Sequence, residues 1–303
     1  MHNPSGLELS SRRLSKRLFL KVSSLSTPAV GQLFGQPIPT EDWPLRLGLI
    51  SDIHYADLPA AGSRHYRDSI QKVREAIARF NDAQVDAVLC LGDLIDSGST
   101  IEKELGHLQT IREELKQLQA PIAFVLGNHC VWGLTKQEFL TGVGQASAYQ
   151  CIRLKGIRLI LLDACYRHDG APYGRQNYDW KEADIPISQQ LWLEKTLQDS
   201  EEPALVFVHH RLDVDNHYGI RSAAKVRRIL EESGQVAAVF QGHNHLNAHQ
   251  RLEEIHYLTM QAMIEGKWPE KNAYSLIHFN PAKGDLIIEG VHDQASYQIK
   301  NLA

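Results

Sequence analysis

Five short polar clusters, each placed directly after an apolar run, constrain this 303-residue chain more than any other feature. The clusters are Asp52-Ile53-His54, Gly92-Asp93, Gly127-Asn128-His129, His209-His210 and Gly242-His243-Asn244-His245. Together they supply the nitrogen and oxygen ligands that a hydrolase with two divalent cations uses. The clusters therefore predict that separate segments of the chain fold around one metal centre.

The apolar runs before the clusters have the length and composition of buried strands, because they are short and rich in Val, Ile, Leu and Phe. Strands are expected at residues 45–50, 85–91, 122–126, 158–163, 204–208 and 236–240. Apolar residues at helical spacing predict amphipathic helices at residues 70–80 and 101–118. This alternation indicates an α/β fold with helices covering the sheets.

The position of the clusters predicts how they meet. In α/β sheets, sites form at the carboxyl ends of the strands, and every cluster follows a predicted strand. Glycines at positions 92, 127 and 242 suit sharp exits that bring the backbone close to a bound ion or phosphate. The i, i+2 spacing within the first and last clusters directs two side chains the same way from an extended segment.

The overall charge and composition narrow the function class. The formal net charge of −4 gives no electrostatic reason to expect a nucleic-acid partner. No run approaches the roughly 20 apolar residues of a membrane span, so no span is expected. The four cysteines lack metal-binding spacing, and reduced thiols are expected.

The first forty residues differ from the rest of the chain. A Ser-Arg-Arg sequence at residues 11–13 and an apolar stretch after it are similar to a twin-arginine export signal, but residues 15–17 interrupt the usual form. We predict a leader at residues 1–40, either a degenerate export signal or a disordered basic segment, and a catalytic domain at residues 41–303. The protein is then cytoplasmic, or exported if the leader functions.

The five clusters, in this order, resemble the motifs of the calcineurin-like metallophosphoesterases, and the resemblance covers about residues 45–290. It implies a four-layer α/β/β/α sandwich with a dinuclear metal site at the strand carboxyl ends. The implied ligands are Asp52, His54 and His245 for the first metal, Asn128, His209 and His243 for the second, and Asp93 as the bridge. His129 would contact the phosphate and protonate the leaving group without binding metal. Many members have proline where this chain has Arg211, which suggests a contact between Arg211 and substrate.

A closer resemblance surrounds the first cluster. Residues 51–57, SDIHYAD, and residues 64–69, RHYRDS, are similar to the manganese-dependent ADP-ribose/CDP-alcohol diphosphatases, which often have glutamine in place of His54. Tyr66 and Arg67 would then open a helix whose amino end meets a distal phosphate. The alternative is an exposed first turn with a solvated Arg67.

Two other segments carry weaker signals. The polar and aromatic stretch at residues 166–186 has no periodicity, which is typical of a functional loop or of a disordered insertion. Glu265-Gly266, after a strand-like run at residues 257–263, either supports the site or only turns the chain.

We therefore predict a metal-dependent phosphoesterase that uses a metal-bound hydroxide on a phosphodiester or a nucleoside-diphosphate-linked substrate of the ADP-ribose/CDP-alcohol type. The expected cofactors are two divalent ions of manganese, iron or zinc, with manganese favoured. The expected partner is a small-molecule phosphate ester or a nucleotide-derived substrate. A phosphomonoesterase would use the same ligands, and a non-catalytic metal-binding scaffold is the alternative from another class.

Overall fold

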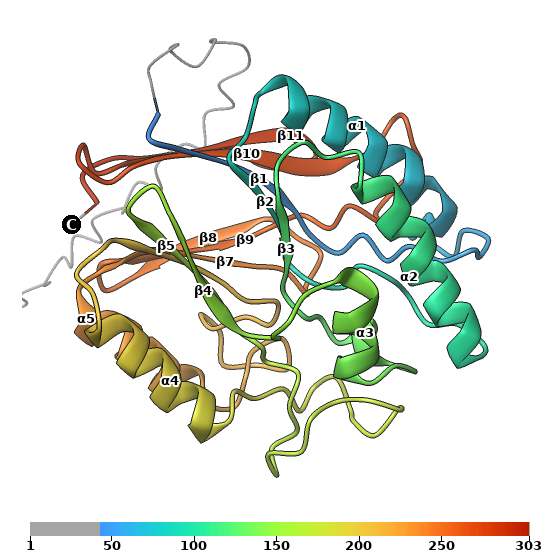
Figure 1. The fold of residues 1–303 in the computed structure, drawn as a ribbon, viewed down its shortest axis with the longest axis horizontal. Coiled ribbons are helices and arrows are strands. Elements are labelled where there is room, and N and C mark those ends of the chain that lie inside the picture. The colour runs from blue at the N-terminus through green and yellow to red at the C-terminus, as the bar shows by residue number, and fades with distance from the viewer. Residues whose placement is uncertain (1–42, 303) are drawn as a thin grey trace, which may run out of the picture. The chain divides into compact units, whose positions relative to one another are not determined.

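Two six-stranded β-sheets pack face to face in the computed structural model, which describes residues 43–302 (Figure 1). The first sheet contains β1 (Leu45–Ile50), β2 (Ala87–Cys90), β3 (Ile122–Phe124), β10 (Ala273–Asn280), β11 (Asp285–His292) and β12 (Tyr297–Ile299). The second contains β4 (Gln150–Leu154), β5 (Ile157–Leu161), β6 (Ala204–Phe207), β7 (Val236–Gln241), β8 (Ala248–Leu252) and β9 (Ile255–Thr259). The predicted leader lies outside the described residues, so its nature and the localisation of the protein stay predictions.

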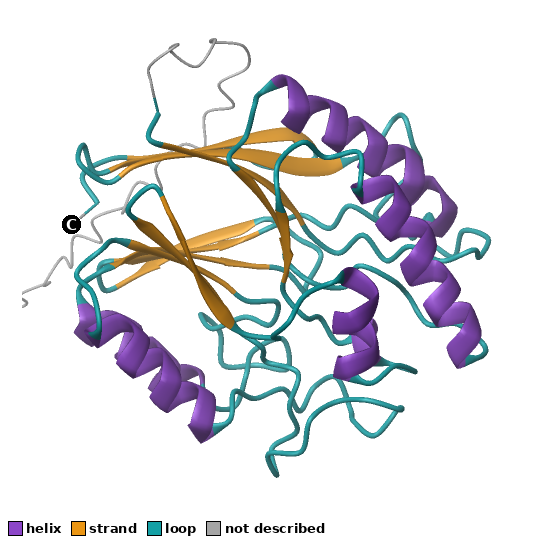
Figure 2. Cartoon of the chain, viewed as in Figure 1, coloured by secondary structure: helices purple, strands orange, loops and turns teal. Residues whose placement is uncertain are grey.

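Helices cover the outer faces of both sheets (Figure 2). They are α1 (Ser69–Asp82) and α2 (Ile101–Leu115) on the first sheet, α4 (Ile187–Gln198) and α5 (Ala223–Ser233) on the second, and the short α3 (Lys136–Val143) beside α2. The predicted four-layer α/β/β/α sandwich is thereby confirmed. Within residues 43–302, none of the helices has the length and apolar content needed to cross a membrane.

The strands that precede the polar clusters are parallel to one another within each sheet. In the first sheet β1 pairs with β2 and β2 with β3, and in the second β5, β6 and β7 are parallel neighbours. The antiparallel strands β10, β11 and β12 extend the first sheet on the other side of β1. Because parallel neighbours end at the same edge, each sheet delivers its clusters to one edge.

An apolar core lies between the two sheets. Leu45, Leu47 and Leu49 are alternate residues of β1, and their side chains belong to this core. Phe207 and Phe240 from the second sheet stack within it, with 5.3 Å between ring centroids. The helices bury the other face of each sheet, which explains why the strands are continuous apolar runs in the sequence.

The sequence predicted the places of these strands better than their ends. β1 has the expected bounds, whereas β2 is shorter than the expected 85–91, and α2 ends before the expected residue 118. The strand-like run at 257–263 ends as β9 at Thr259. Residues 166–186, which are described throughout, contain neither a helix nor a named strand, as predicted for a loop.

Gly48 allows α1 to pack directly against β1. Val73, Ile77 and Phe80 belong to the buried face of α1. A Cβ atom at position 48 would lie 2.8 Å from Cγ of Phe80, which is closer than carbon atoms pack. The absence of a side chain at Gly48 therefore sets the distance between this helix and the sheet.

We expect Gly48→Ala to lower the free energy of unfolding by about 1–3 kcal/mol, because the added methyl group overpacks the contact with Phe80. Gly106 in α2 is the matched control, since nothing lies within 4 Å of a Cβ atom there. Gly106→Ala should stabilise the protein by up to about 1 kcal/mol through helix propensity. Urea unfolding followed by circular dichroism measures both variants, and a stabilising effect of Gly48→Ala would contradict the packing argument.

Candidate metal centre

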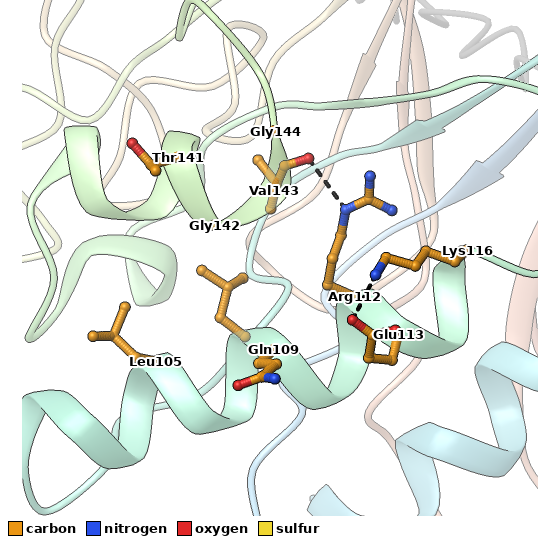
Figure 3. A pocket seen from close by; sticks show the side chains of 10 residues that line it. Leu105, Gln109, Arg112, Glu113, Lys116, Thr141, Gly142, Val143 and Gly144 are labelled. Atoms are coloured by element: carbon orange, nitrogen blue, oxygen red, sulfur yellow. Dashed lines mark hydrogen bonds and ion pairs between the residues drawn. The ribbon is translucent and has the colours of Figure 1, made fainter.

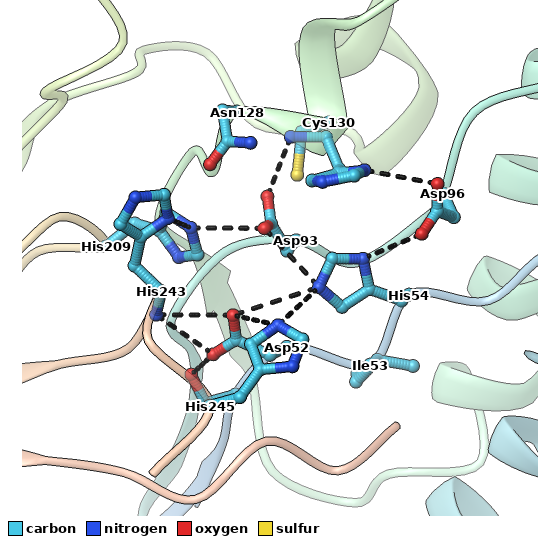
Figure 4. Close-up of polar contacts among 12 residues, drawn as sticks. Asp52, Ile53, His54, Asp93, Asp96, Asn128, Cys130, His209, His243 and His245 are labelled. Carbon is cyan, nitrogen blue, oxygen red and sulfur yellow. Dashed lines mark hydrogen bonds and ion pairs between the residues drawn. The ribbon is translucent and has the colours of Figure 1, made fainter. Parts of the chain in front are cut away.

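Polar side chains from five strand ends converge at one edge of the two sheets (Figure 4). Asp52 and His54 follow β1, Asp93 follows β2, Asn128 and His129 follow β3, His209 follows β6, and His243 and His245 follow β7. Three groups have donor atoms within 4.8 Å of one another, namely Asp52, His54 and His245; His54, Asp93 and His129; and Asp93, His209 and His243. The structure thus brings the residues of all five clusters together.

The first group joins segments that are 191 positions apart in the chain. Nε2 of His54 lies 3.1 Å from Nε2 of His245 and 3.9 Å from Oδ1 of Asp52. Nε2 of His245 lies 3.6 Å from the same carboxylate oxygen. Asp52 and His54 are fully buried, while His245 borders solvent. These three residues form one half of the centre.

Asp93 is the carboxylate shared by both halves. Its Oδ2 lies 3.4 Å from Nε2 of His54 and 3.2 Å from Nε2 of His209. Nδ1 of His243 approaches the same nitrogen of His209 at 3.2 Å. Asn128 is also buried here, and its Oδ1 has no hydrogen-bond partner within the described part of the chain. The place of Asp93 matches that of a bridging ligand.

These separations fit two cations. Atoms that lie about 2.0–2.1 Å from one metal ion are roughly 2.9–3.4 Å apart when they are neighbours in a tetrahedral or octahedral shell. Four ligand pairs of the centre are 3.1–3.4 Å apart. A buried polar atom such as Oδ1 of Asn128 is costly unless it binds something. The carboxylate, amide and imidazole donors suit manganese, iron or zinc.

His129 lies on the open side of the centre. Its ring meets that of His54 edge to face, with 4.6 Å between centroids, and its backbone N–H donates to Oδ1 of Asp93 at 2.8 Å. The side chain of His129 is 28% exposed, whereas that of His54 is fully buried. His129 is therefore the imidazole of this group that a substrate can reach.

Asp96 holds the rings of two of these histidines. Its Oδ2 lies 3.1 Å from Nδ1 of His54, and its Oδ1 lies 3.1 Å from Nδ1 of His129. The carboxylate thereby favours a proton on each Nδ1 and leaves each Nε2 to face the centre. Asp96 also accepts a long hydrogen bond of 3.5 Å from the guanidinium of Arg64.

Two other oxygen atoms orient imidazoles in the same way. Oε1 of Glu265 lies 2.6 Å from Nδ1 of His245, and the carbonyl oxygen of Leu91 lies 2.8 Å from Nδ1 of His209. Glu265 therefore supports the site, which decides between the two roles expected for Glu265-Gly266. Its hydrogen bond with His245 lowers the pKa of the Glu265 carboxyl to about 2, so this group is an anion.

The pKa values at the centre are set by burial and by the contact between Asp93 and the surrounding imidazoles. Burial raises the pKa of the Asp93 carboxyl, but the imidazoles around it, led by His209, lower it well below its usual value. Burial lowers the pKa of His209, and Asp93 more than reverses this and raises it to about 9. Burial also lowers the pKa of His129, yet Asp93 and Asp96 raise it above its ordinary value. Asp93 thus favours the protonated form of both His209 and His129, so metal binding at His209 is coupled to proton release.

The backbone at the centre is strained. Five non-glycine residues of the centre have left-handed φ angles between 46° and 74°, namely Asp52, His54, Asp93, His243 and His245. Each such residue costs of order 1–3 kcal/mol unless its surroundings fix it, and such strain gathers at functional sites. A Cβ atom on Gly127 would lie 2.2 Å from Oδ1 of Asp93, and one on Gly242 would lie 2.5 Å from Oδ2 of Asp52. These glycines let the backbone approach the two carboxylates, and the expected approach to an ion or phosphate stays a prediction.

His209, and not His210, faces Asp93. The side chain of His210 is fully buried, and neither of its ring nitrogens has a hydrogen-bond partner within residues 43–302. Burial lowers the pKa of His210 well below its ordinary value, so the ring is neutral. The geometry therefore favours His209 as the ligand from this pair.

Two of the three residues predicted to bind substrate are paired within the protein. Nε of Arg67 donates to Oδ1 of Asp57 at 2.7 Å, and Arg211 makes two hydrogen bonds of 2.9 and 2.8 Å to Asp213. Tyr66 begins a short 3-10 turn, Tyr66–Asp68, before α1. Substrate binding by these residues stays a prediction.

Sequence reasoning missed three residues that act on the centre. Asp96 lies three positions after Asp93, and this spacing is the only feature of the sequence that could have indicated its role. Arg64 stands beside the predicted Tyr66 and Arg67 but reaches Asp96. The hydroxyl of Tyr178, in the loop at 166–186, donates to the carbonyl oxygen of Asn128, which gives that loop a structural link to the centre.

The surface grooves lie outside the ligand groups. A groove of about 340 Å³ between α2 and α3 is lined by residues that include Leu105, Arg112 and Val143 (Figure 3). A second, of about 510 Å³, is lined by the start of α2 together with Gly133 and Arg175. Neither groove is lined by a residue of the metal-ligand groups, so neither groove is the candidate active site.

Comparison with known proteins identifies the family. The model of the calcineurin-like phosphoesterases matches residues 45–247, most of the described chain. The chain belongs to the calcineurin-like phosphoesterase family. Together with the metal-ligand groups, this confirms a metal-dependent phosphoesterase with a divalent metal centre, a hydrolase of phosphoric ester or anhydride bonds.

Individual relatives of this family member agree with that assignment. The chain is 24% identical over 301 residues to a manganese-dependent ADP-ribose/CDP-alcohol diphosphatase from Oryza sativa subsp. japonica, covering 83% of this chain and 92% of that protein. It is 28% identical over 161 residues to a protein of the same name from Danio rerio, covering 45% and 49%. The fold is similar to that of a dimetal phosphatase from Danio rerio, with a TM-score of 0.76, 19% identity and coverage of 86% and 99%.

We expect Asp96→Asn to lower both turnover and Mn²⁺ affinity by about 10–100-fold, because it removes the anion that orients His54 and His129. Asp86→Asn is the matched control. Asp86 precedes β2 at the opposite end of that strand from Asp93, where it accepts from the backbone N–H of Arg46 at 2.9 Å. Calorimetric Mn²⁺ titration and a phosphoesterase assay compare the two variants. Wild-type Mn²⁺ affinity in Asp96→Asn would contradict this role.

Proposed function

We propose that this phosphoesterase hydrolyses the diphosphate linkage of nucleoside-diphosphate-linked small molecules of the ADP-ribose/CDP-alcohol type. One observation carries the proposal. The guanidinium of Arg64 lies near His129 on one side of the metal centre, and the ring of Trp180 lies beside His243 on the other. The names of the relatives from Oryza sativa and Danio rerio support the same substrate class.

In this proposal the centre divides into two metal sites. The proposed ligands are Asp52, His54 and His245 for the first ion and Asn128, His209 and His243 for the second, with Asp93 shared. When bound, such a pair of ions supplies a hydroxide nucleophile and neutralises charge on the phosphoryl oxygens. Asp96 keeps the Nδ1–H of His129 in place, so its protonated ring can donate from Nε2 to the leaving oxygen. Asp93 and Asp96 raise the pKa of His129, which supports its proposed role as a proton donor.

Aromatic side chains beside His243 support recognition of a base. The ring centroid of Trp180 lies 5.5 Å from that of His243 and 5.8 Å from that of Tyr218. Tyr218 lies 5.8 Å from His243, and both aromatic side chains are only partly buried. They come from two separate loops, at 166–186 and after β6. Partly exposed aromatic rings of this kind stack on planar bases.

Arg64 supports recognition of a second phosphate. Its side chain is 35% exposed, and Nη1 lies 3.5 Å from Oδ2 of Asp96. This long contact leaves most of its donors free, unlike the two-bond pairing of Arg211 with Asp213. A guanidinium binds phosphate oxygens in a planar, two-pronged manner. A phosphate next to the one attacked would lie within reach of such a group.

The experiment that tests the proposal compares substrates of the Mn²⁺-loaded enzyme. ADP-ribose, a bis-aryl phosphodiester and an aryl phosphomonoester are assayed in parallel. We expect kcat/KM for ADP-ribose to exceed the other two values by at least about tenfold, equivalent to 1.4 kcal/mol of transition-state binding. A preference for the monoester would replace this proposal with a phosphatase that uses the same centre.

If Trp180 stacks on the base, Trp180→Ala should raise KM for ADP-ribose by about tenfold, since one base stack contributes about 1–3 kcal/mol. Hydrolysis of an alkyl phosphodiester, which has no ring, should not change. Trp180→Phe is the matched control, because it keeps a ring and should restore most of the affinity. Equal losses on the two substrates would show that Trp180 only supports the fold.

A further inference from the structure

Lys72 is the only lysine in the described residues whose side chain is fully buried. It lies on the buried face of α1, and its ammonium group donates three hydrogen bonds to backbone carbonyl oxygens. The acceptors are Met263 at 2.7 Å, Glu265 at 3.0 Å and Gly266 at 2.7 Å. An ammonium group has three donors, so each one is used. Burial lowers the pKa of Lys72 to about 8, which leaves the charged form dominant at neutral pH.

The segment that Lys72 binds runs alongside the first half of the metal centre. The backbone N–H groups of Met263 and Ile264 donate to the carbonyl oxygens of Ser51 and Asp52, both at 3.0 Å. The N–H of Gly266 donates to Ser63 at 2.7 Å. These bonds hold one side of the segment to the loop after β1. Lys72 supplies the donors on its other side, where the carbonyl groups point toward α1.

Glu265 connects this segment to the metal centre. Its backbone carbonyl is bound by Lys72, and its side-chain Oε1 lies 2.6 Å from Nδ1 of His245. The other ring nitrogen of His245 faces Asp52 and His54. A shift of the backbone at residue 265 would therefore turn the imidazole of His245 away from its partners. The same segment also holds the backbone of Asp52 through the N–H of Ile264, so its contacts reach two residues of this half of the centre.

We propose that Lys72 is a positioning residue for the metal centre, which fixes the backbone of Glu265 so that its carboxylate holds His245 ready to bind the first metal ion. This inference rests on the metal centre of the proposed function and adds a residue to it. Lys72 touches neither substrate nor ligand. The described contacts of Lys72 lead to the half of the centre that contains Asp52, His54 and His245, so the main effect is expected there.

The test is an Mn²⁺ titration of the full-length protein, with free Mn²⁺ followed by electron paramagnetic resonance. The wild-type chain is expected to bind two ions. Lys72→Met keeps the length and apolar stem of lysine but removes the donors. It should lower the affinity for one of the two ions by about 10–100-fold, the usual effect of losing a group that orients a metal ligand. The affinity for the other ion should not change.

Arg158 is the matched control, because it is also fully buried and also donates to backbone carbonyl groups. It lies near the amino end of β5, and it binds Glu202 at 3.0 Å and Thr196 at 2.8 Å. Arg158 pairs with Ala204 at the start of β6, the opposite end of that strand from His209. Arg158→Met should lower the melting temperature and leave both Mn²⁺ affinities unchanged. If both variants weaken Mn²⁺ binding equally, or if Lys72→Met binds both ions as the wild type does, the proposal is wrong.

A coupling experiment distinguishes positioning from a general loss of structure. If Lys72 acts through Glu265, then Lys72→Met should have no further effect on Mn²⁺ affinity in a chain that already carries Glu265→Gln. Additive losses would overturn the proposal. If Lys72→Met does not fold, Lys72→Gln, which keeps two donors, replaces it in both titrations. The affinity for the same ion should then fall by a smaller factor. A wild-type chain that binds two ions without hydrolysing ADP-ribose would contradict the proposed substrate and leave this inference standing.

Discussion

The structure depends on keeping two carboxylates and several imidazoles in contact inside a buried edge of two sheets. Asp52 and Asp93 are almost completely shielded from solvent, and isolated charges in such a place are costly. The surrounding imidazoles and, when present, divalent cations offset that cost. Around the centre, oxygen atoms of Asp96, Glu265 and Leu91 fix the rings, so the charged groups meet in one arrangement.

The metal centre lies at the ends of rigid strands, whereas the proposed substrate-binding side chains lie on loops. The proposed ligands leave the ends of β1, β2, β3, β6 and β7, which are covered on both faces by the inter-sheet core and the helices. The groups proposed to select a substrate lie on loops instead. Trp180 and Arg64 can therefore differ between relatives without disturbing the metal centre, as expected for function carried by loops on a rigid scaffold.

The sequence predicted that these side chains converge, because a strand followed by a polar cluster can be recognised locally. Asp52, Asp93 and the later histidines each follow directly after one strand, so each could be identified from its local sequence. Asp96 and Lys72 carry no such signal, since their roles arise from contacts with residues that are distant in the chain. The pairing of Arg211 with Asp213 could not be predicted either, because the sequence does not indicate in which direction two neighbouring charged side chains point. Strands β10 to β12 were not predicted individually. Although β10 has eight residues, its apolar run is interrupted by Ser275 and His278, which the fold nevertheless buries.

The insertion of β10 beside β1 has a consequence for synthesis of the protein. The neighbour of β1 on one side, residues 273–280, is synthesised only after residues 51–272 have been made. His245 and Glu265 also arrive late, so the nascent chain holds the first strand and half of the ligands long before their partners exist. An apolar strand with an unpaired edge is prone to aggregate. Newly made chains of this protein would therefore benefit from chaperone protection until residues 273–280 have been synthesised and can pair with β1.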